Sequence, residues 1–213
     1  MHIRLPLPAS LRHRVESEEH AWAFFVSHLL SPPVVWAVWI YAIAWTSGLE
    51  RGQNLLFATL FAAAVCAAPM LFVSLMVRNG RIGDLHMRES RERFIPYSIA
   101  IIGGLICTFA YSHIGADPIF YLVTLATIVE LALMLVGTVF IHVSFHAAGM
   151  ASVISASALM FGLGNGLVFL PLLLLVVLAR LVLQRHTPAQ IMLGASIGVL
   201  APLATVAGLG MLI

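Results

Sequence analysis

Residues 179–198, ARLVLQRHTPAQIMLGASIG, interrupt a long apolar helix with three ionisable side chains, Arg180, Arg185 and His186, and then with Pro188. A charged side chain near the centre of a lipid-buried helix costs roughly 2.5–3.5 kcal/mol. The proline removes a backbone donor and breaks the helix, and an apolar run restarts after it. We therefore expect a cluster of hydrogen-bond donors with a function at this interruption.

The composition around this stretch is that of an integral membrane protein. Of the 213 residues, 61% are hydrophobic and 9% are charged, with a mean hydropathy of +1.02; soluble domains carry about 25% charged residues. All eleven basic residues are arginines, and the formal net charge of +2 gives no indication of a nucleic-acid partner. Cys66 and Cys107 fall within apolar runs, so we expect small buried hydrophobic residues and no disulfide.

The hydropathy pattern predicts an all-α bundle of about six to seven transmembrane helices, because a bilayer core of about 30 Å needs about 20 apolar residues per helix. The predicted spans are residues 33–47, 55–77, 97–114, 118–141, 147–163, 167–183 and 191–213. The first span is short unless it begins within residues 24–30, a stretch that fits an interfacial helix equally well. We expect a polar, partly interfacial segment over residues 1–30 and one transmembrane domain over residues 31–213.

The arginines indicate how the spans are oriented. If the spans alternate in direction, ten of the eleven arginines share one side of the membrane, and only Arg51 lies opposite. Arginine-rich connections usually face the cytoplasm. We expect this side to be cytoplasmic, in the inner or plasma membrane of a prokaryote.

Three polar segments on that side break the apolar pattern. They are residues 78–97, RNGRIGDLHMRESRERFIPY; residues 142–149, HVSFHAAG; and the stretch quoted above. Taken alone, the first fits a solvated basic loop, and the second fits ordinary interhelical hydrogen bonders.

Together the three segments resemble the membrane branch of the type 2 phosphatidic acid phosphatase superfamily. The family's first motif is a lysine, six residues, then Arg-Pro; here His86 precedes Arg93 by the same spacing. The second motif is Pro-Ser-Gly-His, and the chain reads Val-Ser-Phe-His, which keeps Ser144 and His146. The resemblance implies an all-helical membrane phosphatase-like core.

The third motif of that family lies within the opening stretch. It is Ser-Arg, five residues, His, three residues, Asp; here Arg180, His186 and Gln190 follow that spacing. Gly194 and Gly198 follow, where the family is also rich in glycine. The order and spacing of the three motifs agree over about half of the chain.

Four positions depart from the family pattern. His86 replaces the lysine, Phe94 the proline after the first arginine, Phe145 the glycine of the second motif, and Gln190 the final aspartate. The resemblance is therefore to a divergent branch, in which a relative without activity stays an alternative.

The resemblance implies hydrolysis of a lipid phosphomonoester or diphosphate, on a phospholipid or an isoprenoid, through a phosphohistidine. His186 would be the nucleophile and His146 would protonate the leaving oxygen. Gln190 would accept the second ring proton of His186, but without the negative charge of the family's aspartate. The implied reaction needs no metal and no cofactor.

The resemblance also implies which residues bind the phosphate. Arg93 and Arg180 would hold its oxygens with paired guanidinium donors. Ser144 and the backbone amides at the helix start, including that of Phe145, would add donors at a helix N-terminus, which favours an anion. His86 would donate from the place of the family's lysine, although an imidazole is only partly charged near neutral pH.

Other interpretations stay open at this point. A non-catalytic protein that binds anionic lipid, or a subunit of a larger complex, would keep the same fold. Glu130 within a predicted span is either a functional acid, which would suit a transporter, or a packing residue. His142 lies four residues before His146, a spacing that suits a metal, but no further ligands are evident.

Overall fold

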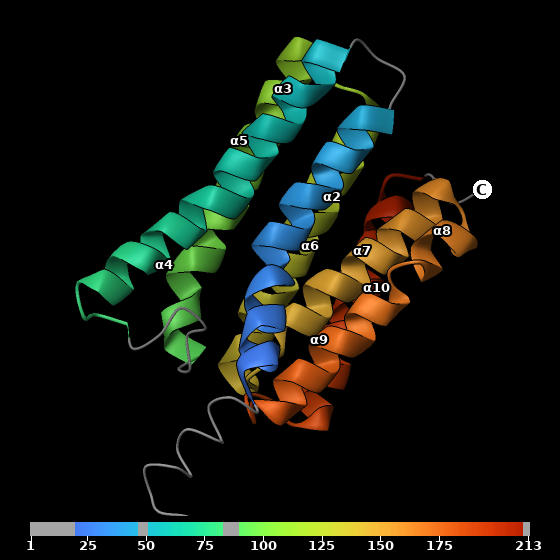
Figure 1. The fold of residues 1–213 in the computed structure, drawn as a ribbon. Coiled ribbons are helices and arrows are strands. Elements are labelled where there is room, and N and C mark those ends of the chain that lie inside the picture. Colours follow the sequence, from blue (N-terminus) through green and yellow to red (C-terminus); the bar gives the residue numbers. More distant parts are fainter. Residues whose placement is uncertain (1–19, 47–50, 83–89, 211–213) are drawn as a thin grey trace, which may run out of the picture.

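The computed structural model describes residues 20–46, 51–82 and 90–210, and every regular element in these ranges is a helix (Figure 1). The first helices are a bent pair, residues His20–Leu29 and α2 (Pro32–Thr46), whose axes differ by 48°. Pro32 and Pro33 at the start of α2 have no N–H to continue the preceding helix. Residues 24–30 thus belong to a separate helix that meets α2 at a bend, as in a broken span or a re-entrant segment.

The second helix is continuous from Arg51 to Arg78, and a π-helical segment divides it. It comprises α3 (Arg51–Phe61), the π-helix η1 (Ala62–Ala67) and α4 (Ala68–Arg78). Ala68 N–H bonds to Ala63 O, five residues back, just before Pro69. The wider π-helical turn accommodates Pro69 in the middle of the helix. In a regular α-helix a proline there would remove a hydrogen bond, because it has no N–H.

The remaining helices complete one bundle. They are the short 3-10 helix η2 (Ser90–Arg93), α5 (Phe94–Ile114), α6 (Pro118–Phe140), α7 (Phe145–Phe161), α8 (Leu163–Leu167), α9 (Leu170–Val182) and α10 (Pro188–Gly208). Gly115, in the left-handed conformation, ends α5, and the Asp117 side chain accepts a hydrogen bond from Ile119 N–H at the start of α6. Short connections of this kind leave no room for a second domain between α5 and α10.

The helices long enough to cross a membrane number at or just below the lower end of the six to seven predicted from the sequence. Five meet the length and hydropathy requirements, and the bent pair makes a sixth if it is one span. The difference is α7, whose 17 residues reach only about 25 Å. Because α2, α6, α8, α9 and α10 pack around it, 11 of its 17 residues are buried. Its apolar sequence therefore reflects the core of the bundle and not contact with lipid.

The polar segments gather at one end of the bundle (Figure 1). The end of α4, the start of α5, the α6–α7 link and the α9–α10 link all lie there. Six of the seven described arginines belong to this end: Arg78, Arg81, Arg91, Arg93, Arg180 and Arg185. Arg51, at the start of α3, lies at the other end, where its guanidinium carbon is 4.4 Å from the Trp45 ring centroid.

Helices α7 and α10 approach so closely that two glycines of α10 meet the backbone of α7. A Cβ atom on Gly194 would overlap Ser144 O, and one on Gly198 would overlap Ala148 O. The spacing of four residues puts both glycines on one face of α10, an arrangement typical of tightly packed membrane helices. This contact holds the first turn of α7 against α10, and Ser144 N–H bonds to Gln190 O at 3.2 Å.

We predict that Gly198→Val destabilises the fold, because the added side chain must push α10 away from backbone that cannot move aside. Overpacking of this kind costs roughly 1–3 kcal/mol. Thermal unfolding in detergent should show a lower midpoint for Gly198→Val. Gly208→Ala is the matched control, since nothing lies within 4 Å of its added Cβ. Equal losses in the two variants would contradict the close contact between α7 and α10.

Candidate functional site

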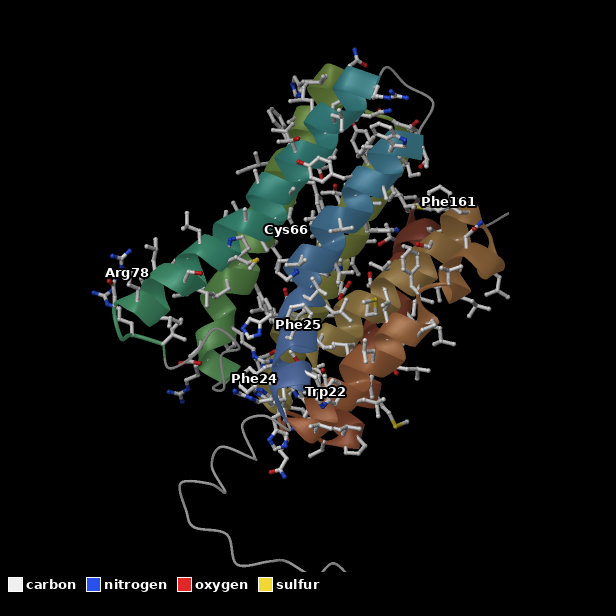
Figure 2. The ribbon with its side chains drawn as sticks, in the orientation of Figure 1. Trp22, Phe24, Phe25, Cys66, Arg78 and Phe161 are labelled. Carbon is white, nitrogen blue, oxygen red and sulfur yellow. The ribbon has the colours of Figure 1, made fainter. Side chains whose placement is uncertain are left out.

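A cavity of about 170 Å³ lies near the arginine-rich end of the bundle. One water molecule needs only about 10–15 Å³ on this measure, so the cavity has room for a phosphate group. Its polar wall includes Arg93, His146, Arg180 and His186. Side-chain nitrogen atoms gather at this end of the bundle (Figure 2). Four residues predicted from three separate motifs therefore line one cavity.

Arg93, at the start of α5, is almost fully buried and bonds to the link between α6 and α7. Its Nη1 donates to Val143 O at 2.8 Å, and its Nη2 lies 2.7 Å from His142 Nε2. Because a guanidinium can only donate, the His142 nitrogen is the acceptor. Two nitrogen atoms of one guanidinium are thereby fixed on adjacent residues of the link.

His186, in the α9–α10 link, is buried against the same residues. Its Nδ1 lies 3.2 Å from His142 O, and its ring stacks on the His142 ring with centroids 5.0 Å apart and planes at 27°. A carbonyl only accepts, so this contact puts the proton of a neutral His186 on Nδ1. Its lone pair is then on Nε2, the nitrogen available to attack.

His146 and Arg180 both contact Ser27, a residue that the sequence did not single out. His146 Nε2 donates to Ser27 O at 2.9 Å, and Arg180 Nη1 donates to Ser27 Oγ at 3.5 Å. The helix ends at Leu29, two residues after Ser27, and Ser31 N–H bonds to His28 O instead. The only signal in the sequence was the proline pair, since carbonyls at a helix end need other partners.

Ser144 and Phe145 occupy the start of α7, as predicted. Ser144 Oγ is fully buried and has no hydrogen-bond partner among the described residues. The Phe145 ring makes edge contacts with Trp36, at 5.5 Å between centroids, and with Tyr97, at 5.1 Å. Phe145 thus packs the cavity wall with its side chain, and only its backbone amide suits an anion.

Gln190 has a different partner from the one predicted. Its Oε1 accepts from Thr187 N–H at 2.9 Å, while Thr187 Oγ1 accepts from Gln190 N–H, a capping box at the start of α10. The capping box satisfies backbone donors that α10 would otherwise leave exposed. In this arrangement the partner of Gln190 Oε1 is therefore the Thr187 backbone and not the ring of His186. The carbonyl of His142 takes that place.

Two other residues weighed from the sequence have different outcomes. His86, the predicted substitute for the family's lysine, lies outside the described residues. Glu130 is fully buried in α6 and is not part of the cavity lining. Among the described residues no group of three His, Cys, Asp or Glu side chains could hold a metal.

The two stacked histidines are strongly biased toward the neutral form. Burial, together with the charges of Arg180 and Arg93 and the neighbouring His142, lowers the pKa of His186 from 6.5 to about 3. Burial, together with the charges of Arg93 and Arg180, lowers the pKa of His142 to about 4. The lining contains no Asp or Glu among the described residues. The site therefore presents buried positive charge beside a neutral imidazole.

Comparisons with family models, curated proteins and solved structures found no match to this chain. Its chemistry must therefore be derived from the cavity itself, in which two arginines and two histidines from three distant segments converge.

We predict that acidification destabilises the protein partly through His142 and His186. Their pKa values are lower in the folded protein than in the unfolded chain, so the unfolded state gains protons first as pH falls below about 6.5. The thermal midpoint should fall between pH 6.5 and 4.5, and fall less in a His142→Gln/His186→Gln double variant, which cannot titrate there. Equal pH dependence in both proteins would contradict the lowered pKa values.

Proposed function

We propose that the protein is a membrane phosphatase that hydrolyses the phosphomonoester or diphosphate of a lipid through a phosphohistidine. The observation that carries the proposal is the convergence of Arg93, His146, Arg180 and His186 on one cavity. These residues come from three distant segments of the chain, and each has the chemistry that its role in phosphoryl transfer requires.

The transfer to the protein uses both histidines. The Nε2 lone pair of His186 forms a bond to phosphorus while the bond from phosphorus to the leaving oxygen breaks. His146 enters this step as an imidazolium: the leaving oxygen takes its Nε2 proton, which in this structure is donated to Ser27 O, and leaves His146 as a neutral imidazole. Water then attacks the phosphohistidine and gives its proton to His146, which releases phosphate and restores both rings.

The arginines supply the electrostatic part of the reaction. Arg93 and Arg180 are each only 3% exposed. Charge-assisted hydrogen bonds to a phosphate are strong, and a guanidinium presents its donors in a geometry that suits paired oxygens. Fixed donors of this kind also stabilise the charge that develops on the equatorial oxygens during transfer. A cavity without lining carboxylates among the described residues favours an anionic head group.

The rest of the cavity wall suits an apolar chain. Apolar lining comes from α2, the second helix and α5, and it includes Trp36, Val65, Pro69, Val73 and Ala100. Met70 and Ser74 belong to the lining and are also exposed on the outside of the bundle. The cavity therefore opens sideways, toward the lipid. An amphiphile fits this site, with its phosphate on the arginines and its tail along α4.

A second function, binding of an anionic lipid without turnover, has specific support. His146 and Arg180 both donate hydrogen bonds to Ser27. Gln190 caps the start of α10 instead of orienting His186. A binding protein needs the two arginines but needs no reactive histidine. The two functions therefore differ in what they require of His186.

We predict that the purified protein releases phosphate from lysophosphatidate, phosphatidate or a polyprenyl diphosphate. The activity of His186→Ala should be lower by at least about 1000-fold, because no other group replaces the nucleophile. Malachite-green detection of phosphate in detergent provides the measurement. His113→Ala is the control, since His113 is exposed at the far end of α5.

Background release that is the same for the wild type and His186→Ala would reject the phosphatase. If both proteins still bound anionic vesicles under those conditions, and an Arg93→Gln/Arg180→Gln double variant did not, the lipid-binding function would replace it.

We also predict that the site faces the cytoplasm, because arginine-rich ends stay on that side. Arg78→Cys at the site end should react with an impermeant maleimide only in inverted vesicles. Gly52→Cys at the other end should react in intact cells. The natural Cys66 and Cys107 are buried and contribute little labelling. Reaction of Arg78→Cys from outside would place the site on the opposite face.

A further inference from the structure

We propose that His142 is the positioning residue of this site, fixing both the nucleophile and one phosphate-binding arginine. The inference rests on the proposed function. It assigns to the α6–α7 link the orienting role that the sequence pattern gave to Gln190. His142 belongs to none of the three motifs, and the only role weighed for it from the sequence was metal binding.

The α6–α7 link is shaped to present its backbone to the site. α6 ends at Phe140, and Val143 N–H turns back to bond Ile141 O at 2.8 Å, a tight turn centred on His142. The carbonyl groups of His142 and Val143 are therefore not used in a helix. They accept from His186 and Arg93 respectively. The break in the helix is what makes these acceptors available.

His142 acts on the nucleophile in two ways. Its carbonyl fixes the Nδ1–H form of His186, at 3.2 Å, so that Nε2 keeps its lone pair. Its ring stacks on the His186 ring and limits rotation about the bond that would turn Nε2 away. A carbonyl has no charge with which to stabilise an imidazolium, so it orients His186 without raising its basicity.

The same residue acts on the arginine through its ring. His142 Nε2 accepts from Arg93 Nη2 at 2.7 Å, so a neutral His142 carries its proton on Nδ1. The guanidinium plane is thereby fixed relative to the His186 ring by a single intervening side chain. A misplacement of about 1 Å at a reacting centre costs on the order of 100-fold in rate. One residue thus sets the spacing between nucleophile and phosphate.

The tautomers can be observed without any turnover. In ¹H–¹⁵N spectra that correlate ring nitrogens with ring protons, both His142 and His186 should be neutral at pH 7 with the proton on Nδ1. Spectra of His142→Gln and His186→Gln assign the two rings among the nine histidines. A proton mainly on Nε2 of His186, or on Nε2 of His142, would overturn the positioning role.

Two substitutions separate the two actions of the ring in the phosphatase assay. His142→Phe keeps a flat ring for stacking but removes the acceptor for Arg93, so KM should rise about tenfold with kcat within about threefold. His142→Gln keeps an acceptor but removes the stacked ring, so kcat should fall about tenfold with KM nearly unchanged. His113→Phe is the matched control and should leave both constants unchanged.

The outcomes keep the two proposals apart. If the wild type shows no turnover but has the expected tautomers, and His142→Phe weakens binding of inorganic phosphate in calorimetry, the phosphatase fails and the positioning role stands. If the wild type turns over and both variants keep its kcat and KM, the positioning role fails and the phosphatase stands. The positioning role is also rejected if His142→Phe and His142→Gln lose kcat equally and in proportion to the fraction of protein that remains folded. Such a result would show that His142 only supports the fold.

Discussion

The buried guanidinium of Arg93 determines the shape of the α6–α7 link and, through it, the arrangement of the site. A buried charge needs hydrogen-bond acceptors, and the protein supplies them by breaking the helix between α6 and α7, so that Val143 O and the His142 ring face Arg93. The same break offers His142 O to His186. One irregular link therefore satisfies a cation and orients an imidazole, and the site depends on that link more than on any single helix.

The link is held in place by the helices on either side of it. Gly194 lets α10 touch the backbone at Ser144, and Ser144 N–H bonds to Gln190 O. The capping box of Thr187 and Gln190 fixes the start of α10, directly after His186. A larger residue at position 194 would separate the two links that carry His142 and His186. The geometry of the site thus depends on the close packing of α7 against α10.

The apolar pattern predicted the helical bundle and the interruption at Arg180 and His186, because charge in an apolar chain has few explanations. Arg93 and His146, which share the cavity with them, were singled out only by the resemblance to a known family. Hydropathy overestimated the spans at α7, since a helix enclosed by protein is as apolar as one in lipid. The contacts of Ser27 and His142 with the site were not predicted, because they involve backbone carbonyls, which every residue has, and these depend on where the helices break. The capping box of Thr187 and Gln190 does have a sequence signature, a threonine followed three residues later by a glutamine.

The most direct measurement is rapid quenching of the protein in alkali during turnover of a ³²P-labelled lipid phosphate, followed by analysis of protein-bound label. A nucleophilic His186 predicts label that is stable in alkali, lost in acid, located on His186, and absent from His186→Ala. Phosphate release by the wild type with no label on His186 at any quench time would contradict the phosphohistidine and, with it, the role of the cavity in phosphoryl transfer.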